Sequence, residues 1–356
     1  MINHRIGCCK PLKKFSQQIP SLCRLRQMRS YATGDNVSIG PSRIEFSAKR
    51  SSNDNFKFEF AFSCYAYHSP SEIPMISSLA DLSGGGNVAA LMPLRRAPGS
   101  PLDTLSVRSG DDAMICSSSL LGVADGVSDW KENADAGLWA RSLLETMSRG
   151  LARHKVESSP YSPTLKDVQE ILDSSFFHTS DLMDVEGLSG SSTALICTIL
   201  GSQLAVISIG DSKVFVIRDG DVVETNEIQM LSALCPQQLG TNNINVIPSQ
   251  IAWYDSFELE EDDIIVMSSD GLTDNLWPDE ILVYVDKTIF REKKSLKELA
   301  NLLVYKAKTV AYDNFAVSPY VEIVNKLPSK SSGAGFIMGG KTDDISVCVA
   351  RVVKND

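Results

Sequence analysis

The alternation of apolar and polar residues predicts strands interrupted by pairs of amphipathic helices. Residues 56–67 alternate well enough to form a first strand. Residues 114–123 form an apolar run that ends at Asp125-Gly126, as expected where a buried strand enters a turn. Apolar residues spaced three and four apart over 134–151 and 165–183 then predict two helices that could cover one face of a sheet.

A second group of strands follows these helices. Strands are expected over 193–200, 204–209, 213–217, 222–223, 264–269 and 345–353, and helices over 280–285 and 296–311. The strands at 193–200 and 204–209 join at Gly201-Ser202-Gln203, and Arg218 to Asp221 forms the next hairpin turn, so the region predicts an antiparallel meander. The polar stretch 226–250 is interpreted as a flap or insertion beside the sheet. The whole order predicts an α+β fold with two sheets covered by helices.

The start of the chain differs in composition from the rest. Residues 1–33 contain no acidic residue, and their basic residues are Arg5, Lys10, Lys13, Lys14, Arg24, Arg26 and Arg29. Basic, apolar and hydroxyl residues alternate as in a mitochondrial presequence, cleaved near residues 31–33. The alternative is a disordered basic arm. We expect a polar tether over 34–55 and a large domain over 56–356, interrupted by a surface insertion rich in Ser, Pro and Gly at about 69–100.

Composition narrows the classes of function. A net charge of −10 argues against a general nucleic-acid binder, and a surplus of carboxylates suits hard cations. The eight cysteines include no CxxC pair, which disfavours a zinc finger or a disulfide framework, and Cys197 and Cys348 in apolar runs are expected to be core residues. The apolar run 194–209 is broken by Ser202 and Gln203, so we expect no transmembrane span.

Aspartate recurs at the ends of four predicted strands or turns. The four segments are Gly110-Asp111-Asp112-Ala113, Val123-Ala124-Asp125-Gly126, Ser268-Ser269-Asp270-Gly271 and Lys341-Thr342-Asp343-Asp344. One Asp-Gly pair proves little, since Asp219-Gly220 is an ordinary hairpin turn. Several carboxylates converging from rigid strand ends would suit Mg²⁺ or Mn²⁺.

The ordered series of motifs is more specific than any one of them. Between the acidic segments lie Gly190-Ser191-Ser192-Thr193-Ala194 and Gly210-Asp211-Ser212-Lys213, and Asp274 follows Asp270 by four residues. Over about residues 105–353 this series resembles the type 2C, or PPM, metal-dependent Ser/Thr protein phosphatases. The resemblance implies a four-layer αββα sandwich, with two antiparallel sheets packed face to face, helices on both outer faces and metals in a cleft at one end.

The resemblance also implies a mechanism and roles for individual residues. Two Mn²⁺ or Mg²⁺ ions about 4 Å apart would lower the pKa of a bridging water, and the resulting hydroxide would hydrolyse phosphoserine or phosphothreonine. Asp125 would bridge the ions with the Gly126 carbonyl on one of them, Asp270 and Asp343 would hold the second, and Asp111 would contact the cluster through water with Asp112 in support. Asp211 and Asp274 match a weaker third metal site; the alternatives for them are a solvated turn and a helix cap.

Two departures from the family pattern bear on catalysis. Val127 stands where many members carry a histidine as general acid. Arg108 is our candidate for the phosphate-binding arginine although it stands one position out of register with the family pattern, and Arg95 and Arg96 are rivals for that role. The second hypothesis is therefore a weakly active or inactive regulatory or binding module on the same fold, and a third is a bacterial-type regulator phosphatase. A cysteine-based phosphatase is disfavoured because no cysteine lies in a Gly-rich loop ending in Arg.

The Asp125-Gly126-Val127-x-x-Trp130 form, the Pro236-x-Gln238-Leu239 segment and the basic leader resemble the mitochondrial branch of the family. That closer resemblance implies phosphoprotein substrates in the matrix or at the inner membrane, with coenzyme Q biosynthesis proteins as candidate targets.

Overall fold

The computed structural model describes residues 54–67, 100–127, 134–158, 163–327 and 335–355. Backbone contacts divide the chain into residues 1–50 and 51–356, and every described residue belongs to the second unit. The predicted presequence, most of the tether and the insertion apart from Ser100 lie outside the described residues. Residues 54 and 55, predicted as tether, belong to the folded domain instead: the Asp54 carboxylate pairs with Lys155 Nζ at 2.7 Å, and Asn55 N donates to Gly201 O.

Two antiparallel sheets form the centre of this unit. One has the order β1 (Phe56–Tyr65), β15 (Ile345–Lys354), β14 (Ile264–Ser268), β8 (Lys213–Arg218) and β9 (Asp221–Thr225). The other has the order β13 (Trp253–Glu258), β7 (Gln203–Ile209), β6 (Ala194–Leu200), β4 (Leu120–Ala124), β3 (Asp112–Cys116) and β2 (Leu105–Ser109).

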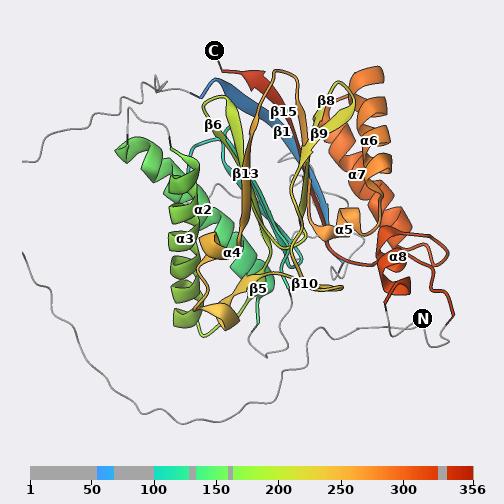
Figure 1. Cartoon of the computed structure of the whole chain (residues 1–356), viewed down its shortest axis with the longest axis horizontal. Helices are drawn as coiled ribbons and strands as arrows, with labels where there is room; N and C mark the ends of the chain where they lie inside the picture. Colours follow the sequence, from blue (N-terminus) through green and yellow to red (C-terminus); the bar gives the residue numbers. More distant parts are fainter. Residues whose placement is uncertain (1–53, 68–99, 128–133, 159–162, 328–334, 356) are drawn as a thin grey trace, which may run out of the picture. The chain divides into compact units, whose positions relative to one another are not determined.

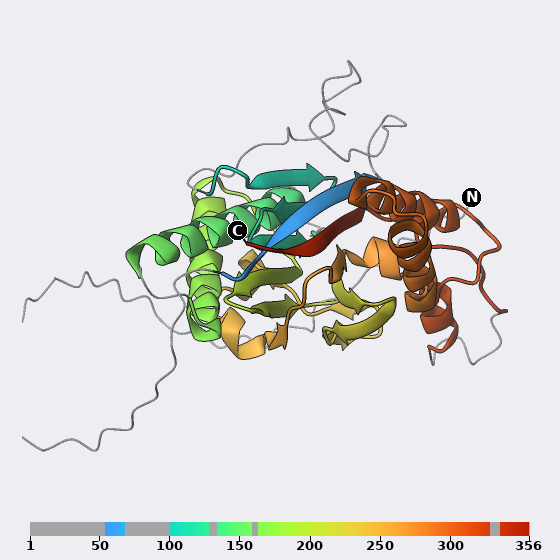
Figure 2. The ribbon, with the colours of Figure 1, turned by 90° about the horizontal axis from the view of Figure 1, so that it is seen from above.

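Helices cover the outer face of each sheet. Helices α2 (Ala136–Glu157) and α3 (Leu165–Val185) share a buried apolar cluster with the six-stranded sheet. Helices α6 (Pro278–Val285) and α7 (Leu296–Ala311) share another with the five-stranded sheet. Figures 1 and 2 show the four layers from two directions, with α2 and α3 on one side and α6 and α7 on the other. The predicted α+β sandwich is thereby confirmed.

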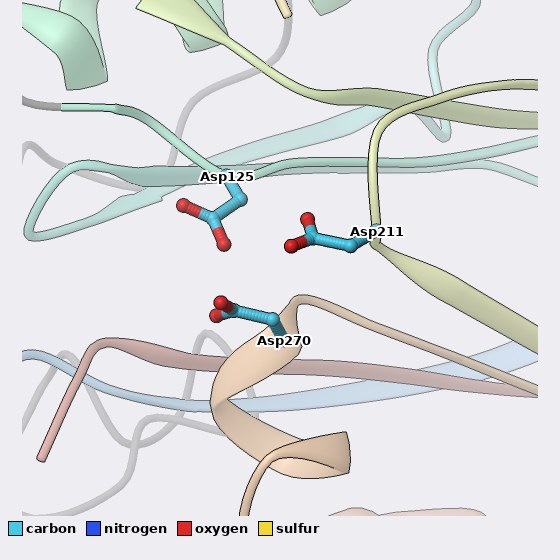
Figure 3. A group of neighbouring side chains, drawn as sticks. All are labelled: Asp125, Asp211 and Asp270. Atoms are coloured by element: carbon cyan, nitrogen blue, oxygen red, sulfur yellow. The ribbon is translucent and has the colours of Figure 1, made fainter. Parts of the chain in front are cut away.

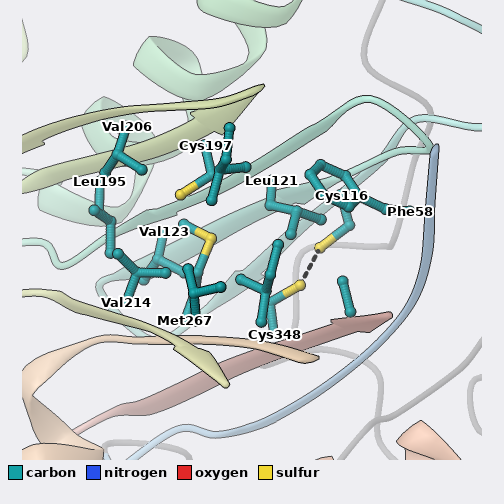
Figure 4. Close-up of a cluster of buried hydrophobic side chains, with 14 of the residues drawn as sticks. Phe58, Cys116, Leu121, Val123, Leu195, Cys197, Val206, Val214, Met267 and Cys348 are labelled. Atoms are coloured by element: carbon teal, nitrogen blue, oxygen red, sulfur yellow. Dashed lines mark hydrogen bonds between the residues drawn. The ribbon is translucent and has the colours of Figure 1, made fainter. Parts of the chain in front are cut away.

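Strand β14 shows why the central strands have continuous apolar sequences. Its Ile265 and Met267 point into the core between the sheets, whereas Ile264 and Val266 point toward α6 and α7. Both faces are therefore buried, and each large apolar side chain contributes roughly 1.5–3 kcal/mol by leaving water. Figure 4 shows the core between the sheets, where Cys116 Sγ of β3 lies 3.3 Å from Cys348 Sγ of β15. Cys197 and Cys348 are buried core residues, as predicted.

Several boundary predictions were wrong. The run 114–123 is two strands, because Ser117 pairs its backbone N–H with Leu120 O at 2.7 Å and closes a hairpin turn. The strand predicted over 264–269 ends one residue earlier, at Ser268, and Asp270-Gly271 begins the short helix α5 (Asp270–Thr273). Sequence patterns missed β2 and β13, which are the edge strands of the six-stranded sheet, and the helix α8 (Pro319–Asn325).

The predicted flap at 226–250 contains short regular elements. They are β10 (Met230–Ser232), β11 (Cys235–Pro236), β12 (Leu239–Gly240), the 3-10 helix η2 (Thr241–Asn243) and α4 (Pro248–Ile251). Strand β12 pairs with β5 (Ser191–Ser192), and a π-helix, η3 (Asp286–Arg291), continues α6. Across the described ranges, none of the helices combines the length and the apolar character needed to cross a bilayer.

Candidate metal centre

Three aspartates from separate elements converge where the two sheets end. Asp125 follows β4 of the six-stranded sheet, Asp211 lies in the connection from β7 to β8, and Asp270 begins α5 directly after β14. One carboxylate oxygen from each lies within 4.8 Å of the others. Figure 3 shows the three carboxylates pointing toward a common centre. Sequence motifs 145 residues apart thus meet at one point, which no local pattern could establish.

The glycines that follow Asp125 and Asp270 permit this convergence. A Cβ on Gly126 would lie 2.1 Å from the Asp111 backbone oxygen, and one on Gly271 would lie 2.0 Å from the Asp344 backbone oxygen. Neither position tolerates a side chain unless the backbone moves. Each glycine therefore lets one acidic segment approach another, which is a different reason for glycine than the turn that Asp219-Gly220 forms.

Thr193, in the Gly-Ser-Ser-Thr-Ala segment, connects two of the acidic positions. Its hydroxyl accepts from Asp125 N at 2.9 Å, and its own N–H donates to Asp125 O at 2.8 Å. The same hydroxyl lies 2.9 Å from Ser212 Oγ, next to Asp211. Thr193 therefore fixes the spacing between Asp125 and the Asp211 loop. The Gly190-Ser191-Ser192-Thr193-Ala194 segment was part of the motif series, but its position in the sequence predicted no role for Thr193.

Asp343 and Asp274 lie with Asp270 around the ammonium of Lys341. Lys341 Nζ pairs with an oxygen of Asp270, lies 2.8 Å from Asp274 Oδ2 and lies 3.0 Å from Asp343 Oδ2. Asp274 is the C-cap residue of α5 through its backbone N–H, and its carboxylate faces the acidic group. Lys341 begins the Lys341-Thr342-Asp343-Asp344 segment, but its sequence context predicted no function for it.

Three further aspartates lie beside this group and hold the acidic segments in place: Asp111, Asp112 and Asp344. The buried Asp112 accepts a hydrogen bond from Ser269 Oγ at 2.7 Å, beside Asp270. Asp344 accepts from the backbone N–H of Asp111 at 2.8 Å and of Tyr67 at 2.7 Å. Gly110 has φ +66°, and a Cβ there would meet the Asp344 carboxylate at 2.3 Å. Hydrogen bonds to Asp344 therefore connect the last acidic segment to the first. The sequence alone predicted no role for Asp344.

The electrostatics of the group favour a bound cation. Burial, and then the nearby charge of Asp270, raise the pKa of Asp211 to about 8 and that of Asp125 well above its usual range. Burial also raises the pKa of Asp274 to about 6. Burial acts in the same direction on Asp270 and is the largest single effect there, but the charge of the Lys341 ammonium and the hydrogen bonds of the carboxylate with Lys341, Asp125 and Asp274 together outweigh it, so the pKa of Asp270 is lowered. Because these carboxylates repel one another when ionised, a bound cation would stabilise their ionised forms.

The oxygen atoms themselves fit a hard divalent ion. Asp211 Oδ1 and Asp270 Oδ1 are buried and have no hydrogen-bond partner among the described residues. Buried polar atoms are usually paired, so such oxygens point to a ligand. An all-carboxylate set suits Mg²⁺ or Mn²⁺ rather than softer metals. Asp125, Asp211 and Asp270 could hold such an ion directly, with Asp343 and Asp274 adjacent.

Arg108 and Val127 lie next to this group. Arg108 Nε donates to Gly110 O at 2.9 Å, and its Nη2 pairs with Asp135, the N-cap residue of α2, at 2.7 Å. The backbone N–H of Val127 donates to Ser191 O at 2.9 Å, and the Ser191 hydroxyl donates to Val127 O at 3.2 Å. The Val127 side chain has no group that could donate a proton. Arg95 and Arg96, the rivals of Arg108, lie outside the described residues.

Comparison with solved structures supports the fold. The chain is similar to the photosystem II phosphatase PBCP, with a TM-score of 0.57 and 23% identity over 83% of this chain and 98% of that one. It is also similar to the catalytic domain of the Ser/Thr phosphatase PstP in complex with two manganese ions, with a TM-score of 0.52 and 17% identity over 84% of this chain and 99% of that one. At these identities the likeness establishes the fold alone.

Sequence relatives identify the family, although no family model matches the chain. It is 29% identical to probable protein phosphatase 2C 71 of Oryza sativa subsp. japonica, over 80% of this chain and 54% of the relative. It is 30% identical to probable protein phosphatase 2C BIPP2C1 of the same plant, over 69% of this chain and 40% of the relative. The chain thus spans about half or less of these plant relatives.

A third relative is matched over most of its own length. The protein phosphatase PTC7 homolog fig of Drosophila mojavensis is 30% identical over 261 residues, which cover 69% of this chain and 78% of the relative. With this match and the four-layer fold together, the chain belongs to the type 2C, or PPM, family of metal-dependent protein phosphatases.

Proposed function

We propose that this protein is a Mn²⁺- or Mg²⁺-dependent phosphatase that hydrolyses phosphoserine and phosphothreonine in proteins. The observation that carries the proposal is the convergence of Asp125, Asp211 and Asp270. Among the described residues, the buried oxygens Asp211 Oδ1 and Asp270 Oδ1 have no hydrogen-bond partner. When bound, the divalent ions would lower the pKa of a water molecule, which could then lose a proton at neutral pH and attack phosphorus, and they would neutralise charge on the phosphoryl group.

The proposed roles of the ligands follow the family pattern. Asp125 would join two ions with help from the Gly126 carbonyl, Asp270 and Asp343 would hold the second ion, and Asp211 and Asp274 would form a weaker third site. Asp111 would act through water. Asp112 would support the group from the core through its bond to Ser269.

Arg108 is the proposed contact for the substrate phosphoryl group. Its bonds to Gly110 and Asp135 fix the guanidinium plane, and N–H groups remain on both Nη atoms. Val127 cannot protonate the leaving serine or threonine oxygen, so that proton must come from solvent or from another group.

The test is phosphate release from a phosphothreonine peptide by the full chain with Mn²⁺, with Mg²⁺ and with excess EDTA. Asp125→Asn should lower kcat/KM by at least about 100-fold, because a metal ligand is lost. Asp219→Asn is the matched control, since Asp219 is also in an Asp-Gly pair but lies exposed in the β8–β9 turn at φ 53°. Metal-independent turnover, or equal activity of the two variants, would refute the proposal.

Val127 favours one second candidate, a regulatory or binding module with little catalysis. Such a module would bind Mn²⁺ yet release no phosphate under any of the three conditions. The same assay combined with calorimetric metal titration separates the two functions.

We further propose a mitochondrial location, in the matrix or at the inner membrane. The acid-free basic segment 1–33 supports it, as does the similarity to relatives named PTC7 homolog. In this proposal residues 1–33 are removed, a tether follows, and the catalytic domain carries the insertion at about 69–100. Fractionation of cells that express the full chain or a chain lacking residues 1–33 tests it, since only the full chain should reach mitochondria.

Phosphorylated coenzyme Q biosynthesis proteins are the proposed targets within that compartment. The closer sequence resemblance to the mitochondrial branch is what supports them. Mitochondrial extract treated with the wild-type chain should lose phosphate from these proteins, whereas extract treated with Asp125→Asn should not.

A further inference from the structure

The Lys341 side chain has an unusual position for a cation in a metal-binding family. Its ammonium contacts three carboxylates, those of Asp270, Asp274 and Asp343. An ammonium has three hydrogen-bond donors, so one donor is available for each carboxylate. The Lys341 side chain is 24% exposed, and Asp270, Asp274 and Asp343 are 13%, 20% and 38% exposed, so water competes only weakly with the contacts to Asp270 and Asp274 and more strongly with the contact to Asp343.

The backbone of Lys341 is held independently of its ammonium. The Asn275 side chain accepts from Lys341 N at 3.0 Å and donates to Lys341 O at 2.9 Å. The preceding Gly340 packs against α7, where a Cβ would meet Val310 O at 2.2 Å. The main chain is therefore fixed close to α5 and α7, while the flexible four-carbon side chain can move its charge without unfolding the segment.

These contacts place the Lys341 ammonium on the carboxylates that would hold the proposed second and third metal ions. Asp270 and Asp343 are the proposed ligands of the second ion, and Asp274 belongs to the third. A divalent ion on these oxygens and the Lys341 ammonium would repel each other at a few ångströms, in a partly enclosed site where the repulsion is poorly screened.

We propose that Lys341 is an internal competitor for the metal site: its ammonium balances Asp270, Asp274 and Asp343, and a divalent ion must displace it to bind there. Lys341 therefore lowers the affinity of this side of the centre for Mn²⁺ or Mg²⁺ and stabilises the carboxylates when metal is scarce. It is a positioning residue rather than a catalytic one. The inference rests on the proposed metal chemistry, but its test uses no catalysis.

The experiment compares the full wild-type chain with Lys341→Met, Lys341→Arg and Lys155→Met. Methionine keeps a flexible unbranched side chain, shorter by the ammonium nitrogen, and removes the charge, whereas arginine keeps the charge. Lys155→Met is the matched control because it removes a lysine that pairs with one carboxylate, Asp54, at 2.7 Å on the edge of the domain. Mn²⁺ affinity is measured by isothermal titration calorimetry, and Tm is measured in EDTA.

Lys341→Met should bind Mn²⁺ about tenfold more tightly or better, as expected when a competing ligand is removed. Its Tm in EDTA should fall below that of wild type, because three neighbouring carboxylates lose their counter-charge. Lys341→Arg and Lys155→Met should bind Mn²⁺ as wild type does. A merely structural lysine would give the opposite sign, since its loss would loosen the ligands, so equal or weaker binding by Lys341→Met would overturn the proposal.

A measurement on the wild-type chain covers the case in which Lys341→Met does not fold. Brief acetylation followed by peptide mass spectrometry reports how accessible each lysine amine is. Lys341 should react faster with Mn²⁺ than with EDTA, while Lys155 should react equally in both. An unchanged rate at Lys341 would refute displacement. If phosphopeptide hydrolysis fails but these shifts occur, the proposed function falls and the inference about Lys341 stands.

Discussion

At the scale of single residues, the centre depends on two glycines as much as on the carboxylates. Gly126 and Gly271 each lie against the backbone oxygen of another acidic segment, at Asp111 and Asp344. Their close approach brings four motifs to one place. A methyl group at either position would push these segments apart and displace the adjacent aspartate.

Gly126→Ala should therefore damage the centre more than it damages the fold. The new Cβ, 2.1 Å from Asp111 O, requires a backbone shift beside Asp125. A misplacement of about 1 Å at reacting groups can cost about 100-fold in kcat/KM, and overpacking costs about 1–3 kcal/mol of stability. Steady-state kinetics and denaturant unfolding give the two values. Gly335→Ala is the control, because a Cβ there meets nothing within 4 Å and should change neither.

At the scale of elements, the α2 helix is joined to β2 by a buried polar network. The Arg141 side chain is 1% exposed, and its Nε lies 3.0 Å from Glu145 Oε1 and from Ser106 Oγ. Ser106 also donates to Glu145 at 2.7 Å. This network ties α2, whose N-cap residue Asp135 is the partner of Arg108, to the strand that carries Arg108.

Glu145→Ala should destabilise the domain by about 3–5 kcal/mol, because it leaves the Arg141 charge buried without its carboxylate. The free energy of unfolding from urea denaturation measures the effect. Glu170→Ala on α3 makes a matched comparison: Lys166 and Glu170 have the same i,i+4 spacing but are 81% and 66% exposed, so their pair should contribute about 0.5 kcal/mol or less. A similar loss of unfolding free energy in the two variants would contradict the expectation that the buried ion pair contributes more than the exposed one.

At the scale of the whole domain, the centre joins the two sheets at one end of their common core. Asp125 follows a strand of one sheet, and Asp270 follows a strand of the other. An ion shared by these residues would add a link between layers that otherwise meet through apolar contacts such as those in Figure 4. Metal binding and domain stability should therefore be coupled.

Mn²⁺ at 100 times its Kd should raise the free energy of unfolding by about 2.7 kcal/mol. Thermal unfolding at several Mn²⁺ concentrations should show a rising Tm that EDTA reverses. Asp125→Asn should lose most of the rise, whereas Asp219→Asn should keep it. A Tm that does not depend on Mn²⁺ would exclude a shared ion between the sheets.

The sequence by itself determined the order and type of most elements and the identity of the acidic positions. Helices α2, α3 and α7 were predictable because each buries one stripe of side chains with a period near that of the helix. Central strands such as β14 and β15 were predictable because both of their faces are buried. The motif series also indicated the αββα fold, through resemblance rather than periodicity.

Tertiary structure alone decided which distant residues meet. Edge strands β2 and β13 were missed because pairing on one side, rather than apolar pattern, makes them strands. The roles of Thr193, Asp344 and Lys341 depend on partners that other elements bring within 3 Å. Such contacts arise from the packing of two sheets against each other, which sets distances between segments that the local sequence cannot encode.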